Sequence, residues 1–477
     1  MAENVSHSAK VVQLTKWPFS TNTMWLAFAT LVGLVIWFMP LLPGLTSAGQ
    51  HALAVVLFTV LLWITRATPT SVSSLLMIGI VVCFMSSDVK PSAFLSFWSG
   101  DTMWFILVCF IFGAVVDLSG LGKRLTVYVF QIQNIFLLDL GLLVVNLLFS
   151  FLGMNASFPK IVLLFPLVAT VAAMSGMPKD DPYVRHLALM INVLANVTGT
   201  MIYTGFVINF LVGPLGGFSV GYATWIEWFF VPALVYTLVC FAAVYVLFPP
   251  RAGEHLNIKA EQEEARKLGP LTSKERLTIA WLAFAVLLWA TGPLTNIPSG
   301  FAAVLVASMM MLPGIGVVTF KDFIRETDWN SVFMLMGILS IGALGATGFA
   351  SWIWGHILPA HMPHSPMLSL TILSGLVELL HVPLGSIATS TALAVPSLAN
   401  YADTLGMSRI LTSFVTYMTI AGQFFFIYQN AALVCGAAYG LWKATDIFKY
   451  GVIMFFATPI TFGVLLYPWW IHMGWIH

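Results

Sequence analysis

Repeated apolar runs of membrane length are the feature that most constrains the fold of this 477-residue chain. The first covers residues 24–42 and others follow as far as residue 468. A helix needs about 20 such residues to cross the hydrocarbon core. Only 8% of residues are charged, against about 25% in soluble domains. This composition excludes soluble enzymes and nucleic-acid-binding proteins, and predicts an all-α polytopic membrane protein whose surroundings are a lipid bilayer.

Positive charges predict which side of the membrane each loop occupies. The linker 249–276 holds six of the 20 Lys and Arg residues, so the positive-inside rule places it in the cytoplasm, together with the N-terminal segment 1–23. An even number of crossings must separate these two segments. Six crossings before the linker and five after it give about 11 transmembrane helices, with the C-terminus outside. Seventeen basic residues then lie inside, Lys90 and Arg409 lie outside, and Lys160 lies within the membrane.

The two membrane segments, residues 24–248 and 277–477, resemble each other weakly. A leading span opens the first, and Pro166–Met177 aligns with Pro396–Met407 at an offset of 230 residues. Five crossings separate the copies, so the second copy is inverted. Inverted-topology repeats are typical of secondary transporters. Apolar sequences also align by chance, which is the alternative explanation.

Each repeat contains a pair of apolar runs joined by a small, polar, Pro- or Gly-containing tip. We interpret the pairs 136–174 and 366–404 as re-entrant helical hairpins, although two full crossings would sort the charges equally well. Irregular backbone at membrane depth is tolerated only where it lines a cavity or is buried in protein. Helix N-termini exposed there favour anions. We therefore expect a substrate site at the tips, formed by Asn155, Ala156, Ser157, Ser386, Ile387, Ala388, Thr389 and Ser390. The alternative is a pair of kinks packed by small residues.

A broken helix is expected after each hairpin. The first break would begin at residues 196–200 and continue through 203–205, and the second would run from Gly422 to Asn430. These segments would complete the substrate site through Thr198, Thr200, Thr204, Gly205, Gln429 and Asn430. Packing by Gly and Thr explains the same residues nearly as well.

Two basic side chains accompany the tips: Lys160 near the first and His381 near the second. A charge at membrane depth is expensive and points to function, so both are candidates for compensating the charge of an anion. Lys160 could instead snorkel or pair with an acid, and Glu378 could neutralise His381 because the two share a helix face. Asp117 and Asp139 lie near span ends and are expected to be interfacial.

Four segments resemble the divalent anion/sodium symporter family: KLGPLTSKER at 267–276, LWATG at 288–292, IPS at 297–299 and ETDWN at 326–330. The likeness covers most of the chain. It implies a homodimeric elevator-type carrier with a Ser-Asn-Thr motif at each hairpin tip, where the motifs contact substrate carboxylates and sodium. Here Ala156 and Ile387 contribute no side-chain oxygen, so the chain is most similar to the sodium-independent dicarboxylate exchangers of that family.

The sequence thus predicts an exchanger of C4 and C5 dicarboxylates, such as succinate, malate, fumarate or 2-oxoglutarate, in a bacterial inner (plasma) membrane. A sodium-coupled di- or tricarboxylate symporter is the main alternative, and a cation/proton antiporter is a further one that should need acidic residues at the tips. No phosphate-binding loop, metal-ligand cluster or nucleophile–base pair occurs in the sequence. We therefore expect no cofactor, no metal and no enzymatic activity.

Overall fold

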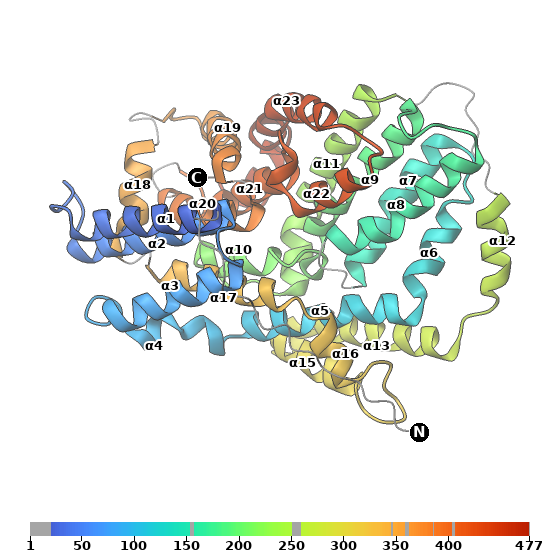
Figure 1. The fold of residues 1–477 in the computed structure, drawn as a ribbon, viewed down its shortest axis with the longest axis horizontal. Helices are drawn as coiled ribbons and strands as arrows, with labels where there is room; N and C mark the ends of the chain where they lie inside the picture. The colour runs from blue at the N-terminus through green and yellow to red at the C-terminus, as the bar shows by residue number, and fades with distance from the viewer. Residues whose placement is uncertain are drawn as a thin grey trace.

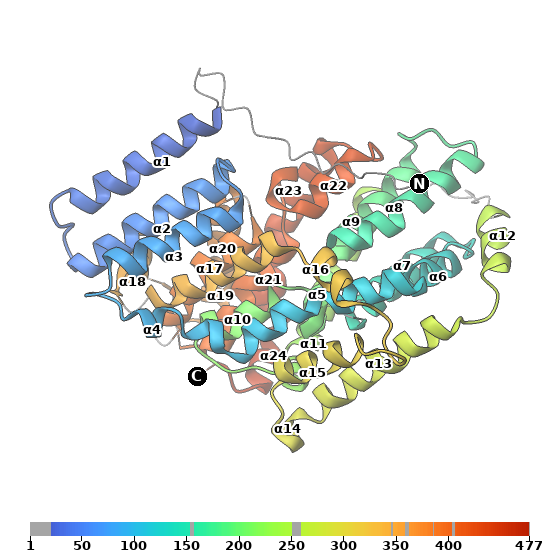
Figure 2. The same cartoon turned by 60° about the horizontal axis from the view of Figure 1, so that its bottom comes forward.

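The computed structural model describes residues 21–152, 157–249, 259–344, 347–357, 362–384, 386–402 and 406–476, and these residues fold into helices. Figures 1 and 2 show an elongated bundle with α1 and α12 at opposite ends. The first part comprises α1 (Thr21–Phe38), α2 (Ser47–Thr65), α3 (Thr70–Phe84), α4 (Pro91–Phe94), η1 (Ser96–Ser99), α5 (Asp101–Ser119), α6 (Leu121–Val129), α7 (Ile135–Phe151), α8 (Ser157–Met174), α9 (Pro182–Met201), η2 (Tyr203–Gly205), α10 (Asn209–Gly216) and α11 (Tyr222–Leu247).

The second part begins with α12 in the linker. It comprises α12 (Lys259–Leu268), α13 (Ser273–Ala290), α14 (Gly292–Thr295), α15 (Ser299–Met309), α16 (Phe320–Glu326), α17 (Trp329–Leu344), α18 (Phe349–Ile357), α19 (Pro366–Leu384), α20 (Ile387–Tyr401), α21 (Arg409–Gly422), η5 (Ile427–Gln429), α22 (Ala431–Ala438), α23 (Ala444–Ile460), η6 (Thr461–Leu465) and α24 (Tyr467–His472). The turn η6 is π-helical and joins α23 to α24.

Six helices among the described residues are long and apolar enough to cross a membrane: α1, α2, α5, α11, α19 and the continuous stretch Ala444–His472. Four shorter apolar helices accompany them. The all-helical architecture with several apolar spans is that of a polytopic membrane protein, as predicted. The count of 11 crossings stays a prediction, and α19, with 19 residues, is long enough to cross alone.

The order of elements around each hairpin is similar in the two parts of the chain. The hairpin arms α7 and α8 both pack along α9, and the arms α19 and α20 both pack along α21. After α9 and after α21 the helix is interrupted, and a short helix follows, α10 in the first part and α22 in the second. A longer helix, α11 or α23, comes next.

The short helices connect the two parts of the chain. Helix α10 packs against α20 and α21, whereas α22 packs against α8 and α9. Each short helix therefore contacts the hairpin assembly of the other part. This exchange brings residues more than 200 positions apart in sequence into the same cluster.

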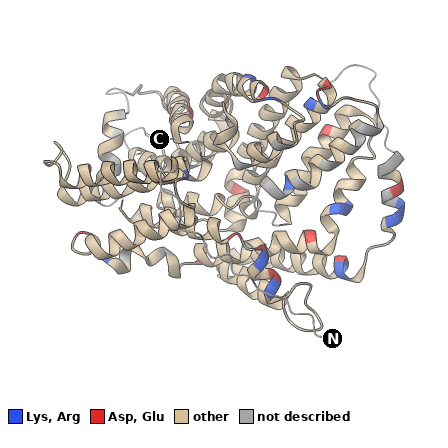
Figure 3. Cartoon of the chain, viewed as in Figure 1, with Lys and Arg blue, Asp and Glu red and all other residues tan. Residues whose placement is uncertain are grey.

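Charged residues are sparse along the ribbon and occur mainly on α12 and near the ends of other helices (Figure 3). Arg124 of α6 is held by several hydrogen bonds. It donates to Glu275 Oε1 at 2.7 Å and to Oε2 at 3.0 Å. Its Nη1 and Nη2 also donate to the carbonyls of Gly269 at 2.8 Å and of Leu268 at 3.2 Å. Arg124 thus connects the end of the linker 249–276 to α6 by hydrogen bonds.

Asp139, which is expected to lie near the membrane interface, has a buried partner. Its side chain is fully buried, and Oδ2 lies 2.8 Å from Nε2 of His186 on α9. The other imidazole nitrogen lies 2.7 Å from the Phe248 carbonyl. Helix α7 thus turns this carboxylate toward α9, where the histidine is its partner.

Candidate functional site

The first hairpin tip is linked to the second part of the chain through Asn196 of α9. Ser157 at the start of α8 donates from Oγ to Asn196 Oδ1 at 2.6 Å, and Asn430 Nδ2 donates to the same oxygen at 2.7 Å. All three side chains are buried. Asn155 and Ala156, which were also predicted to bind substrate, lie outside the described residues.

Lys160 lies one turn into α8 and is fully buried. Its ammonium donates to Ser150 Oγ on α7 at 2.8 Å and to the Ala195 carbonyl on α9 at 3.4 Å. Among the described residues no Asp or Glu lies within ion-pair distance of this nitrogen. The structure therefore supports neither snorkelling to water nor pairing with an acid, and the charge is surrounded by neutral oxygens.

Thr198 and Thr200 are helical, which corrects the expected start of the first break. Helix α9 continues to Met201, and the backbone becomes extended at Ile202. The two hydroxyls donate to carbonyls of their own helix, at 2.6 Å each. The small residues at 196–200 predict an interruption of the helix, but they are buried on all sides and α9 accommodates them as regular helix.

Thr204 and Gly205 do lie in the first break. Thr204 donates from Oγ1 to the Ser150 carbonyl at 3.4 Å, so the break contacts the last turn of α7. A Cβ added to Gly205 would lie 2.7 Å from the Gly199 carbonyl oxygen and 2.7 Å from Ser150 Cβ. Only glycine permits this close approach of backbone segments.

The second tip presents the N-terminus of α20. Ser386 is the N-cap residue in an extended conformation, and its side chain makes no capping hydrogen bond. Ile387, Ala388 and Thr389, which form the first turn, are buried. The first N–H groups of a helix have no intrahelical acceptor, so this turn can contribute backbone donors even where its side chains are apolar.

His381, on the other hairpin arm α19, contacts the first turn of α20. Its Nδ1 lies 2.8 Å from Ser390 Oγ, whereas Nε2 has no hydrogen-bond partner among the described residues. Neither carboxyl oxygen of Glu378 has a partner there either. The described residues thus contain no ion pair between Glu378 and His381.

The second break lies where it was predicted, between Gly422 and Asn430. Gln429 accepts hydrogen bonds through Oε1 from the N–H groups of Phe425 at 2.7 Å and Phe426 at 2.8 Å, and its Nε2 has no partner among the described residues. Asn430 caps α22 by accepting from Ala432 N at 2.7 Å. Its amide nitrogen is thereby directed to Asn196.

A second connection between the parts of the chain was not predicted. Asn209 at the start of α10 donates from Nδ2 to the carbonyls of Gly199 at 2.9 Å and Ile202 at 2.8 Å, which holds the first break in shape. Its Oδ1 accepts from the hydroxyl of Tyr417 on α21 at 2.5 Å. Asparagine after a helix break is a sequence signal, but its partner 208 residues away is not.

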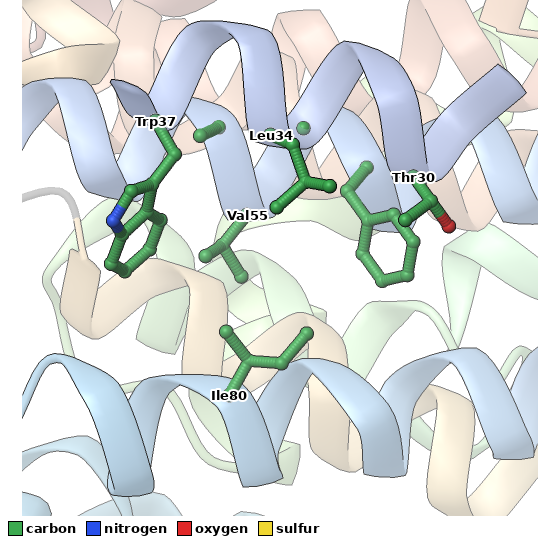
Figure 4. A pocket seen from close by; sticks show the side chains of 8 residues that line it. Thr30, Leu34, Trp37, Val55 and Ile80 are labelled. Carbon is green, nitrogen blue, oxygen red and sulfur yellow. The ribbon is translucent and has the colours of Figure 1, made fainter. Parts of the chain in front are cut away.

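The described hydrogen bonds join each hairpin to the break of its own part and each part to the other. They join the first tip to the second break rather than to the second tip. A separate pocket between α1, α2 and α3 is lined by Thr30, Leu34, Trp37, Val55 and Ile80 (Figure 4). Its lining is apolar and offers no group that would bind a dianion.

The tips and breaks each contain groups of the kind that bind anions. Lys160 supplies a charge, the first turn of α20 supplies backbone N–H groups, and Gln429 Nε2 and His381 Nε2 are buried nitrogens without a protein partner among the described residues. Buried polar groups are normally hydrogen-bonded, so these groups point to a ligand. No cluster of three or more metal-ligating side chains occurs in the described part of the chain.

Comparison with known proteins assigns the chain to a family. The model of the sodium:sulfate symporter transmembrane region matches residues 20–476. The citrate/succinate antiporter of Escherichia coli is 23% identical over 79% of this chain and 82% of its own length. The chloroplastic dicarboxylate transporter 2.2 of Arabidopsis thaliana is 24% identical over 94% of this chain and 84% of its own length.

The chloroplastic dicarboxylate transporter 1 of Spinacia oleracea is 25% identical over 68% of this chain. The match covers 58% of the spinach protein, less than two thirds of its length. Both the family and these relatives are membrane transporters rather than enzymes. The chain belongs to the divalent anion/sodium symporter family, and it is an integral membrane protein with the transport scaffold of that family.

Proposed function

We propose that the protein exchanges one C4 or C5 dicarboxylate for another without sodium, with succinate, malate, fumarate and 2-oxoglutarate as candidate substrates. The substrate would lie between the hairpin tips and the helix breaks. Ser157, Asn196, Gln429 and Asn430 would contact its carboxylates, together with the backbone of the first turn of α20. Lys160 and His381 would offset its charge.

The buried ammonium of Lys160 is the observation that carries this proposal. A charge removed from water costs several kcal/mol unless an opposite charge offsets it. Lys160 contacts only neutral oxygens among the described residues. An incoming carboxylate would provide the missing negative charge, and the lysine would do for the dianion what sodium does in sodium-coupled carriers.

A fixed cation also explains why exchange would be obligatory. Sodium leaves with its substrate, whereas a side chain stays in the protein. An empty carrier would have to move an uncompensated ammonium across the membrane, at a cost of several kcal/mol. A cost of about 4 kcal/mol slows the return step roughly a thousandfold. The loaded carrier would avoid this cost and return quickly.

The movement is proposed to follow the elevator scheme of the family. The similar element order in the two parts, and the contacts of α10 and α22 with the opposite hairpins, support inverted repeats that enclose one site. Homodimerisation and location in a bacterial inner membrane, with the N-terminus cytoplasmic and the C-terminus outside, remain proposals derived from the resemblance and the charge distribution.

Sodium-coupled symport is the competing function. It is favoured by the name of the matching family model, but the second tip has Ile387 and Ala388 where side-chain oxygens would serve a sodium ion. Cation/proton antiport is less well supported, because the described tip residues include neither Asp nor Glu.

Counterflow in proteoliposomes separates these functions. Labelled succinate should enter vesicles that contain unlabelled succinate, at the same rate in sodium and in potassium buffers, and should not enter empty vesicles. Rapid uptake into empty vesicles that depends on an inward sodium gradient would overturn the proposal in favour of symport. A panel of unlabelled C4 and C5 diacids, with sulfate and a monocarboxylate as controls, would define the substrate class.

A further inference from the structure

Glu378 is a buried acid that the proposed transport site does not use. It lies in α19, one turn before His381, and none of its surface is exposed. Neither of its oxygens has a hydrogen-bond partner of good geometry among the described residues, and the nearest polar group is the Thr458 hydroxyl. No Lys or Arg of the described part of the chain forms an ion pair with it. An ionised carboxylate in such a place would be very costly.

The surroundings of Glu378 are hydroxyl groups rather than cations. Thr458 of α23 lies beside the carboxyl, and its hydroxyl is hydrogen-bonded to that of Tyr236 of α11 at 3.0 Å. Tyr450 of α23 completes the cluster and donates to the Gly422 carbonyl at 2.9 Å. The cluster therefore joins the arm of the second hairpin to the point where α21 ends and the second break begins.

The elements that pack against α19, which carries Glu378, are α20, α21, α23, η5 and η6. The titratable groups near Glu378 are Tyr236 and Tyr450, with Cys240 beside them and His381 on its own helix. The charged residues of these elements are Arg409 in the first turn of α21, and Asp446 and Lys449 in the first two turns of α23. Thr458 lies at the other end of α23. Tyr401, Tyr417 and Tyr428 carry no charge at neutral pH.

We propose that Glu378 is a proton-binding site inside the membrane and that its proton holds the second hairpin against α11 and α23. The neutral acid can stay in the dry cluster. Loss of the proton leaves a bare carboxylate, which must draw in water or move α19 away from Thr458. Because α19 carries His381 and leads into the second tip, this movement disturbs the tip and slows transport at alkaline pH.

The direct test does not depend on transport. Infrared difference spectra of the purified protein between neutral and alkaline pH should contain the carbonyl-stretch band of a protonated carboxylic acid. Glu378→Gln should remove this band, and Glu378→Asp should shift it. The exposed Glu227→Gln on α11 serves as a matched control and should leave it in place. A band unchanged in Glu378→Gln, or no such band in the native protein, would overturn the proposal.

The transport test rests on the proposed function and is read separately. Exchange by the native protein should fall by up to about tenfold per pH unit once the site begins to lose its proton. Glu378→Gln, which mimics the neutral acid, should keep its exchange rate constant over the same range. If Glu378→Gln retains the pH profile of the native protein, the proposal that Glu378 controls transport is overturned. If neither the native protein nor Glu378→Gln exchanges dicarboxylates, but the native protein still shows the infrared band, the proposed function is overturned and the proton site is supported.

Discussion

Replacing Asn196 with alanine should uncouple the first tip from the second break. The change removes the oxygen that accepts from Ser157 at 2.6 Å and from Asn430 at 2.7 Å, together with a bond from Nδ2 to the Asn192 carbonyl at 3.0 Å. Two buried donors are then left without an acceptor. Each costs about 1–3 kcal/mol in protein interiors, although measured pairs within membranes average about 0.6 kcal/mol.

A total loss of about 2–6 kcal/mol follows if the two donors find no new partner. At about 1.4 kcal/mol per tenfold change, exchange should slow by roughly 30-fold or more. The assay is succinate counterflow in proteoliposomes, with thermal stability measured in detergent on the same preparations. Asn146→Ala is the matched control, because this buried amide donates only to the Leu142 carbonyl of its own helix.

A double-mutant cycle makes the reasoning refutable. Asn430→Ala should slow exchange by itself, and the combination with Asn196→Ala should be little worse than the poorer single variant, because both remove the same contact. Strictly additive effects would show that the two side chains act independently. Exchange by Asn196→Ala at the rate of the Asn146→Ala control would refute the link altogether.

Three further predictions concern contacts that hold the scaffold. Gly205→Ala should impair folding or exchange, because its Cβ would lie 2.7 Å from the Gly199 carbonyl oxygen; a variant with native melting temperature and counterflow would contradict this. Tyr417→Phe should lower the free energy of unfolding by about 0.5–1.5 kcal/mol, since it removes the donor to Asn209, and a native melting temperature would count against it. Arg124 lowers the pKa of Glu275, in the first turn of α13, to about 2. A depressed pKa gives stability that is present above the ordinary value near 4.5 and is lost as the pH falls toward 2, so acid should release the linker in this range. Glu275→Gln should abolish that pH dependence in hydrogen exchange of α12, whereas an unchanged profile would exclude the ion pair as its cause.

Much of the local structure could be predicted because it depends on local sequence. Apolar runs become helices, and the hairpin arms begin and end near the expected residues, as with α8 at Ser157–Met174. The second break follows from Gly422 and the polar residues after it. The first was placed too early because Thr198 and Thr200 satisfy their hydroxyls within α9, which a sequence pattern does not distinguish from a true interruption.

The partners of the site residues could not be predicted in the same way. Asn196 and Asn430 are 234 residues apart, and they meet only because α22 packs against α8 and α9. The pairing of Asp139 with His186 could not be predicted for a similar reason, since nothing near Asp139 in the sequence indicates this partner. Composition and periodicity specify which residues form a helix, but the docking of distant helices decides which polar groups pair.

The central claim is that a fixed cation at Lys160 takes the place of dissolved sodium. The most direct measurement compares succinate exchange by Lys160→Ala with that of the native protein and of Lys449→Ala, an exposed lysine on α23, all in sodium-free proteoliposomes. Loss of several kcal/mol of charge compensation predicts exchange reduced about a thousandfold in Lys160→Ala, with native thermal stability, and no change in Lys449→Ala. Exchange by Lys160→Ala within a few-fold of the native rate would contradict the claim.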